Sequence, residues 1–400
     1  MHKIYFDNAS TTLLFPEVLE KMTKECHYLF GNPSSRFHSA GWEADEKVSE
    51  ARAFISAFLG ASPTELVFTS GSSEGIKMVY NHFFWNKQVH IVTNKTEHKM
   101  TLLGAETLQN RDWKVTYLSV DSSGKLNFEE EVKNLPKDDD YLFVIMLGNN
   151  EIGTIHELTE IVKIIRRNFL NAYILTDATQ AVTKIPIDFQ SMDVDFLVFS
   201  AHKFHGPKGI GGLLIKKGIE FRPFGINEGQ ERGRRGGTLN VHGIRGMYHS
   251  LKHLSTLGKD VVSQLVLKRD LFEKLIFTEI DDVKQIGDID ARLPQISNLY
   301  FKGIYSEVLL ESFTDVAASN GSACNSANVL PSHVLMAIGL TSEQALSCIR
   351  FSFSFCPLPL FRLFSLYEKD LTNPGALPDA FPAFCAAKTD ERRNQTHRGG

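Results

Sequence analysis

The stretch Phe196-Leu-Val-Phe-Ser-Ala-His-Lys203 joins an apolar run to a polar end. The run at 196–199 is typical of a strand that is buried on both faces of a parallel sheet. A lysine directly after such a strand lies where ligands bind in open α/β sheets, outside the carboxyl ends of the strands. Asp177 ends an earlier run of the same kind, Ala172-Tyr-Ile-Leu-Thr-Asp177.

Lys203 and Asp177 together favour a site for pyridoxal phosphate. A lysine amine can form a Schiff base with the aldehyde of that cofactor, and a carboxylate can keep its pyridine nitrogen protonated. The alternative is that both are ordinary surface residues at strand ends, because two residues alone do not make a specific motif.

Apolar runs alternate with helical patterns along most of the chain. Helical patterns lie at 43–58 and 158–168, and strand-like runs begin at Leu66, His90, Val115, Tyr141, Tyr173, Phe196, Leu213 and Ile296. This alternation predicts an α/β protein with a mostly parallel sheet between helices. A polar helix near 243–258 is expected to mark a domain boundary, after which a smaller α+β unit follows.

Composition limits the classes of function. The chain has 400 residues, 42% of them hydrophobic, which is enough for two domains. The net charge of −4 gives no general nucleic-acid footprint, and no apolar run reaches the ~18 residues of a membrane helix. The beginning of the sequence lacks a secretory signal. Five cysteines without a Cys-x-x-Cys pattern predict free thiols in the cytoplasm.

Serine-rich segments after strands predict an anion site. Thr69-Ser-Gly-Ser-Ser-Glu-Gly75 opens a helical stretch, so its amides and the hydroxyls of Ser72 and Ser73 suit a phosphate. Ser200 and His202 could reach the same phosphate. An ordinary serine-rich helix cap is the alternative.

Further polar residues follow other strands. His98 could lie on the cofactor ring and carry protons, although a lone histidine is more often structural. Asn150 and Gln180 could bond the substrate or the phenolic oxygen of the cofactor, and turn chemistry is the alternative for the asparagine.

Three more candidates lie in the second half of the sequence. Thr238 ends the basic segment Arg232-Gly-Arg-Arg-Gly-Gly-Thr238, which could contact phosphate or simply be a solvated loop. Cys324 lies among small polar residues that predict an exposed loop, where a thiolate can act as a nucleophile. Arg350 lies in a strand-like run and could hold a substrate carboxylate by two parallel hydrogen bonds.

As a set, these segments resemble the cysteine desulfurases, a family of fold-type I pyridoxal phosphate enzymes. The resemblance covers about residues 4–354, and the set is specific although no single segment is. The segments that carry it are Tyr5–Thr12, Phe30–Ser35, Phe68–Glu74, Thr96–Lys99, Asn149–Gly153, Asp177–Gln180, Ser200–Lys203, Gln230–Arg232, Gly237-Thr238, Gly321–Cys324 and Ile349–Ser352.

The resemblance implies a role for each cofactor residue. Lys203 holds the cofactor covalently and later moves the Cα proton of the substrate. Asp177 pairs with the pyridine nitrogen, Gln180 bonds the phenolic oxygen, and His98 stacks on the ring. The phosphate is held by Ser72, Ser73, Ser200, His202 and, from a partner subunit, Thr238.

The resemblance also implies the reaction and its partners. Asn150 and Arg350 hold the carboxylate of L-cysteine, and Cys324 attacks the sulfur, which leaves alanine and a persulfide. No resident metal is implied, although Cys324 could be a transient iron–sulfur ligand. The segment 322–332 is similar to the long loop of the subgroup that serves iron–sulfur assembly, so the implied partners are a second subunit and an iron–sulfur scaffold or another sulfur acceptor, tRNA thiolation included.

The implied fold is a seven-stranded, mostly parallel sheet between helices, with a smaller α+β domain. The expected limits are 15–255 for the large cofactor domain, 1–14 with 256–370 for the small domain, and 371–400 for a flexible tail. After Ile349–Ser352 the chain departs from the Gly-Arg-Phe and long helix usual in the family. The open alternatives are a selenocysteine lyase, an aminotransferase of the same fold, and a catalytically impaired or scaffold-like homologue.

Overall fold

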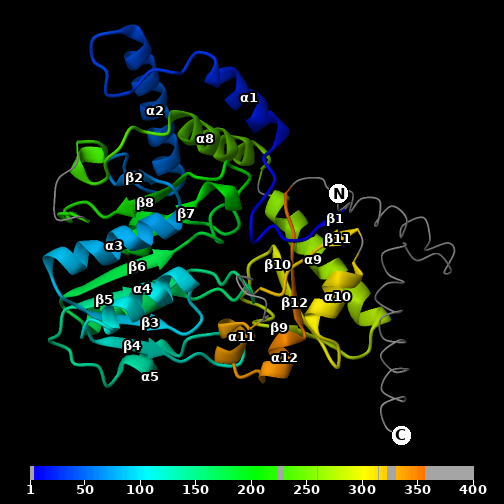
Figure 1. Ribbon diagram of the computed structural model, residues 1–400. Coiled ribbons are helices and arrows are strands. Elements are labelled where there is room, and N and C mark those ends of the chain that lie inside the picture. Colours follow the sequence, from blue (N-terminus) through cyan, green and yellow to red (C-terminus); the bar gives the residue numbers. More distant parts are fainter. Residues whose placement is uncertain (1–3, 224–228, 259, 314, 322–329, 356–400) are drawn as a thin grey trace, which may run out of the picture.

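The structure is a computed structural model that describes residues 4–223, 229–258, 260–313, 315–321 and 330–355 (Figure 1). Cys324 and the expected tail at 371–400 lie outside the described residues. Within the described part, no helix combines the length and the apolar character needed to cross a membrane.

The largest sheet has seven strands in the order β2-β8-β7-β6-β5-β3-β4. Strand β8 runs antiparallel to both of its neighbours, and all other pairs are parallel. The α/β class and the mostly parallel seven-stranded sheet are thus confirmed. The strands are β2 (Leu66–Thr69), β3 (His90–Asn94), β4 (Val115–Leu118), β5 (Tyr141–Val144), β6 (Ala172–Asp177), β7 (Phe196–Ser200) and β8 (Gly211–Ile215).

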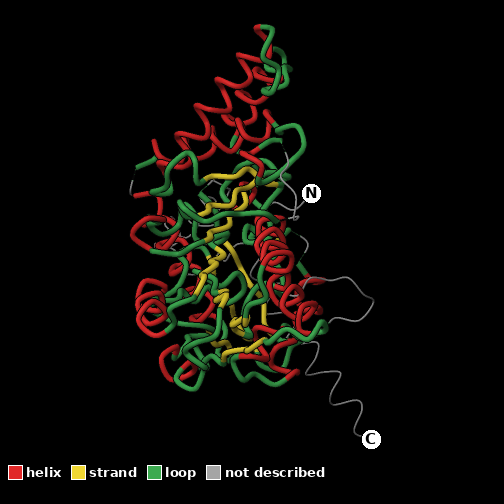
Figure 2. The backbone as a smooth tube through the Cα atoms, turned by 90° about the vertical axis from the view of Figure 1, so that its left-hand side faces the viewer, coloured by secondary structure: helices red, strands yellow, loops and turns green. Residues whose placement is uncertain are grey.

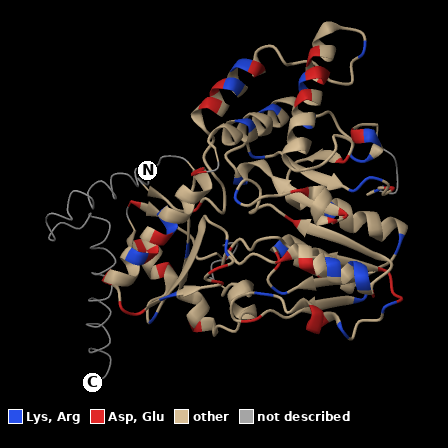
Figure 3. Cartoon of the chain, turned by 180° about the vertical axis from the view of Figure 1, so that it is seen from behind, with Lys and Arg blue, Asp and Glu red and all other residues tan. Residues whose placement is uncertain are grey.

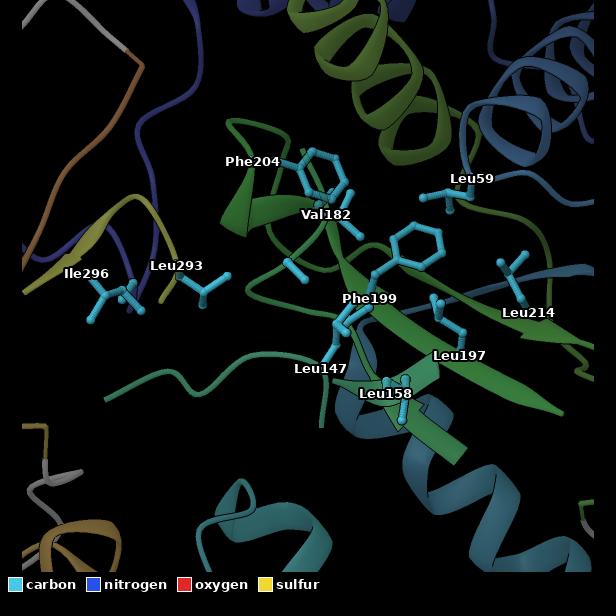
Figure 4. Packing of buried hydrophobic residues seen from close by; sticks show 14 of the residues in the cluster. Leu59, Leu147, Leu158, Val182, Leu197, Phe199, Phe204, Leu214, Leu293 and Ile296 are labelled. Atoms are coloured by element: carbon cyan, nitrogen blue, oxygen red, sulfur yellow. The ribbon is translucent and has the colours of Figure 1, made fainter. Parts of the chain in front are cut away.

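Both faces of this sheet are covered by helices (Figure 2). In β7, Leu197 and Phe199 belong to one buried apolar cluster, and Phe196 and Val198 belong to another. Because side chains alternate between the faces of a strand, these are clusters on opposite faces. Figure 4 shows Leu197, Phe199 and Leu214 packed on the first face. Helices α2 (Ser39–Phe58), α6 (Leu158–Asn168) and α8 (Val241–Thr256) contribute to the first cluster, and α3 (Ser72–Asn86) and α4 (Lys99–Gln109) to the second.

The continuous apolar runs exist because these strands have no solvated face. Every residue of β7 and of β8 is buried. Figure 3 shows most charged residues on helices and loops, whereas the strands of the central sheet are largely uncharged. The helix expected near 243–258 is present as α8, but the expectation that it is polar was wrong, because α8 buries Ile244, Met247 and Leu251.

A second group of strands contains residues from both ends of the described chain. Strand β1 (Ile4–Tyr5) pairs in parallel with β11 (Val316–Ala317), and an antiparallel sheet has the order β12-β10-β9. The ring of Phe272, in α9 (Asp260–Glu279), lies 5.3 Å from that of Phe6 and 4.8 Å from that of Phe351. The sheet consists of β9 (Val283–Ile286), β10 (Ile296–Phe301) and β12 (Cys348–Ser352).

The remaining helices are short, apart from α1, which packs against α8. They are α1 (Pro16–Cys26), α5 (Phe128–Val132), α7 (Phe189–Met192), α10 (Ser306–Ser312), α11 (His333–Ala337) and α12 (Ser342–Leu346).

Candidate active site

All strands of the large sheet except β8 direct their carboxyl ends to one edge. Gly211 of β8 pairs with both Thr69 at the end of β2 and Ser200 at the end of β7. Strands β5, β6 and β7 run parallel, so Asp177 and Ser200 end neighbouring strands at this same edge. The strand-end rule therefore places the polar segments that follow these strands side by side.

These segments surround a cavity of about 620 Å³, a size typical of small-molecule sites. Ten of the twelve sequence-predicted site residues line it. They are Ser72, Ser73, His98, Asn150, Asp177, Gln180, Ser200, His202, Lys203 and Arg350. Thr238 is exposed and is not among the lining residues, and Cys324 lies outside the described residues.

Lys203 ends a short 3-10 turn, Ala201–Lys203, directly after β7. Its Nζ donates to the carbonyl oxygens of Ala9 and Ser10, both at 2.7 Å. Burial and the Arg350 guanidinium lower the pKa of Lys203 to about 8, against the opposing effect of Asp177. About a tenth of this amine is therefore neutral, and hence nucleophilic, at pH 7.

Asp177 and Gln180 are held by one turn after β6. The amide of Thr179 donates to Asp177 Oδ1 at 2.8 Å, and Asp177 is 6% exposed. Gln180 Nε2 donates to the Ala9 carbonyl at 2.8 Å, the same oxygen that accepts from Lys203. The carbonyl of Ala9 thus fixes the side chains of both Gln180 and Lys203.

His98 is the N-cap of α4, where its Nδ1 accepts from the amide of Met100 at 3.2 Å. The ring is exposed to the cavity on one side. The protein packed around the rest of the ring lowers the pKa of His98, and Lys203 lowers it further, while Asp177 opposes this. Nε2 is therefore available to take or give a proton in the neutral ring.

The beginning of α3 forms an anion cradle with the end of β7. The amide of Ser72 donates to Ser200 Oγ at 2.8 Å, and that hydroxyl donates to Ser72 Oγ at 3.1 Å. Gly71 has a φ of +156°, and a Cβ on Gly211 would lie 2.7 Å from the Gly71 Cα. Side chains are thereby excluded and the helix amides stay accessible.

His202 lies beside this cradle, with Nδ1 at 3.2 Å from Thr11 Oγ1. Burial, with the charges of Lys203 and Lys208, lowers the pKa of His202 to about 4. The ring is therefore neutral at physiological pH, and any contact with a phosphate is a hydrogen bond rather than an ion pair.

Arg350 lies in β12 and is 3% exposed. Nη2 donates to Asp7 Oδ1 at 2.7 Å and to Ser10 Oγ at 2.8 Å, and Nη1 donates to the Asn150 carbonyl at 2.9 Å. Nε is buried without a partner among the described residues. Arg350 lines the cavity, and its three hydrogen bonds do not use all five guanidinium N–H groups, which suits an incoming carboxylate.

Sequence reasoning missed three buried ionisable residues near the site. Burial raises the pKa of Glu97 to about 8 and, together with the charge of Lys203, lowers the pKa of Lys184 to about 7. Burial also raises the pKa of Glu151, whose carboxylate accepts from Ser332. Glu97 and Glu151 lie in the segments Thr96–Lys99 and Asn149–Gly153, so their position in these segments could have indicated a role. No feature of the sequence around Lys184 indicates one.

Comparisons with known proteins identify the family of this chain. The sequence profile of the class-V aminotransferases matches residues 4–356. A cysteine desulfurase IscS of Klebsiella pneumoniae is 39% identical over 361 residues, which is 87% of each chain. A cysteine desulfurase IscS of Vibrio campbellii is 39% identical over 358 residues, 88% of this chain and 87% of the relative.

Solved structures share the fold. A NifS-like protein has a TM-score of 0.81 and 31% identity, and the match covers 93% of this chain and 100% of that one. A structure described as SspA in complex with cysteine has a TM-score of 0.77 and 31% identity, covering 88% of this chain and 98% of that one.

Proposed function

The chain belongs to the class-V aminotransferase family, and we propose that it is a pyridoxal phosphate-dependent cysteine desulfurase. It converts L-cysteine to L-alanine and passes the sulfur through Cys324 to an acceptor protein. The convergence of Lys203, Asp177 and His98 on one cavity, in a chain similar to cysteine desulfurases, carries this conclusion.

The residues present fit pyridoxal phosphate at each of its chemical groups. Lys203 offers an amine of lowered pKa to the aldehyde, and Asp177 offers a buried carboxylate to the pyridine nitrogen. The glycine-floored cradle places the hydroxyls of Ser72 and Ser200 at the proposed phosphate position. When bound, this cofactor withdraws electrons from the bonds at the Cα of an amino acid.

The side chains of the site then have separate tasks. Arg350 and Asn150 would hold the substrate carboxylate, and Gln180 would bond the phenolic oxygen. Nζ of Lys203 would take the proton from Cα, because a neutral amine near pH 8 can act as a base. Neutral Nε2 of His98, which lines the same cavity, would assist proton transfer.

The sulfur transfer conserves atoms and electrons between L-cysteine and the Cys324 thiol. The thiolate of Cys324 forms a bond with the substrate sulfur as the carbon–sulfur bond breaks. The electron pair of the broken bond goes to the carbon, which gains a proton and becomes the methyl group of alanine. The products are alanine and a persulfide on Cys324, so no external oxidant is needed.

We also propose a homodimer and a two-domain division of labour. Thr238 is exposed and is not among the residues that line its own cavity, which supports a contact with the phosphate in a partner subunit. Residues 15–255 would bind the cofactor, and 1–14 with 256–370 would form the small domain; the pairing of β1 with β11 supports that grouping. The reaction is placed in the cytoplasm, where thiols stay reduced, with an iron–sulfur scaffold as the proposed acceptor.

Single-turnover labelling tests this function. Purified protein with cofactor is mixed with L-[³⁵S]cysteine without reductant, and labelled peptides are mapped. Label is expected on the peptide that contains Cys324, and it should be absent from Cys324→Ser. A matched control is Cys26→Ser, because Cys26 is an exposed free thiol and its loss should change nothing. Label that persists in Cys324→Ser would contradict the proposal.

A selenocysteine lyase would share the cofactor residues, but the relatives named as cysteine desulfurases favour L-cysteine as the substrate. Rates of alanine formation from L-cysteine and L-selenocysteine separate the two. An aminotransferase of this fold would not need Cys324, so Cys324→Ala with full turnover would favour it.

A further inference from the structure

Lys184 is a buried amine directly behind the proposed cofactor lysine. It is 6% exposed, and its Nζ donates to the carbonyl of Lys203 at 2.8 Å and to Thr183 Oγ1 at 3.0 Å. The ring of Phe355 lies 5.3 Å from this nitrogen. In the described part of the chain, no carboxylate pairs with Lys184, and a buried unpaired lysine is rare because its charge is costly to bury.

The backbone holds Lys184 in this place. The turn that follows β6 is closed by hydrogen bonds from the amide of Ala181 to the Ala178 carbonyl at 2.9 Å and from the amide of Lys184 to the Ala181 carbonyl at 2.9 Å. Thr183 has a φ of +71°, which is unusual for a β-branched residue. The turn that positions Asp177 and Gln180 therefore also aims Lys184.

Two successive carbonyl groups of the turn that carries Lys203 accept hydrogen bonds from residues outside that turn. The His202 carbonyl accepts from the amide of Thr12 at 2.9 Å and from its hydroxyl at 3.0 Å. The next carbonyl, that of Lys203, accepts from Lys184. The direction in which the Lys203 side chain leaves the main chain thus depends on both donors.

We propose that Lys184 is a positioning residue for Lys203: it fixes the peptide from which the reactive side chain departs, and it places a second amine beside the first. This inference rests on the proposed function only in taking Lys203 as the cofactor lysine.

The electrostatic consequence follows from the groups that face Lys184. These groups are Lys203 and His205. Burial, and to a smaller extent the charge of Lys184, lowers the pKa of His205 to about 3, so the ring of His205 is neutral. Burial and the charge of Lys203 lower the pKa of Lys184 to about 7. The charge of Lys203 thus acts on Lys184, whereas the pKa of Lys203 itself is lowered by burial and by Arg350.

The test compares Lys184→Met, which keeps the length of the side chain but removes the nitrogen, with wild type and with Lys163→Met. Lys163 lies on α6 with its side chain 66% exposed, so its replacement is the control. The first readout is the pH midpoint of the visible absorbance of the lysine-bound cofactor, which needs no turnover. The second is the separate effect on kcat and on KM for L-cysteine.

Lys184→Met should keep the lysine-bound absorbance but shift its pH midpoint, because the carbonyl of Lys203 loses the buried donor that fixes its peptide. We expect kcat to fall about tenfold, with KM within about twofold, as for a residue that acts on a catalytic group rather than on substrate. Lys163→Met should match wild type in both readouts.

An unchanged midpoint and unchanged kcat, with only a lower melting temperature, would make Lys184 a stabilising residue and overturn the proposal. If Lys184→Met does not fold, Lys184→Gln, which keeps a donor but no charge, carries the test. Failure of both to fold would also contradict a local role. Wild-type protein with the absorbance but no turnover of L-cysteine would instead contradict the proposed function and leave the spectral test intact.

Discussion

Replacing Arg350 with lysine tests how the site holds its substrate. The change keeps the positive charge but removes the planar guanidinium. Three N–H groups of Arg350 bond Asp7, Ser10 and the Asn150 carbonyl, and Nε has no partner among the described residues. A lysine cannot keep those three contacts and also offer a fixed donor to a carboxylate.

The expected loss in kcat/KM can be calculated from the loss of one hydrogen bond to the substrate carboxylate. A hydrogen bond to a charged partner contributes about 1.5–3 kcal/mol, and about 1.4 kcal/mol corresponds to a tenfold change in rate. Loss of one such bond to the substrate carboxylate therefore lowers kcat/KM by about 10- to 150-fold. Because the carboxylate is held both before and during the chemistry, the loss should appear in KM, with kcat within about threefold.

Steady-state rates of alanine formation over a range of L-cysteine concentrations measure both constants. Arg292→Lys is a matched control, because that side chain is 7% exposed and bonds Glu273 at 2.6 and 2.8 Å without lining the cavity. It should lower the free energy of unfolding and leave kcat/KM unchanged. An Arg350→Lys protein with the wild-type KM would refute this account of carboxylate binding.

Three further predictions concern the cofactor lysine, the cysteine and a buried acid. Lys203→Ala should lose the visible absorbance of lysine-bound cofactor. If this absorbance persists, a lysine other than Lys203 binds the cofactor. Cys324→Ser should keep this absorbance and release no sulfide from L-cysteine. An undiminished rate of sulfide release would contradict a persulfide on Cys324. Burial raises the pKa of Glu97 from 4.5 to about 8, so its contribution to stability is full below pH 4.5 and is lost as the pH rises through about 8. Glu97→Gln should therefore gain unfolding free energy relative to wild type as the pH rises, in urea titrations at about pH 5 and about pH 9; an equal difference at both would count against a neutral Glu97.

The sequence predicts the central sheet well because its strands are buried on both faces. Runs such as 141–144 and 196–199 are apolar throughout, so neither partner nor register is needed to recognise them. The strand-end rule then brings Asp177, Ser200 and Lys203 to one edge, although they are separated along the chain.

Other features could not be predicted, because they depend on contacts between distant parts of the chain. The bond between Arg350 and Asp7 spans 343 positions. The burial of α8 depends on α1 and α2 covering it, and its own sequence reads as polar. Lys184 carries no local signal, since only the folded turn places its amine against Lys203.

Release of alanine and sulfide from L-cysteine, with reductant present, tests the central claim most directly. The account predicts equal amounts of both products from the purified protein with cofactor, and neither product from Lys203→Ala. A folded wild-type protein that binds the cofactor but releases neither product would contradict it.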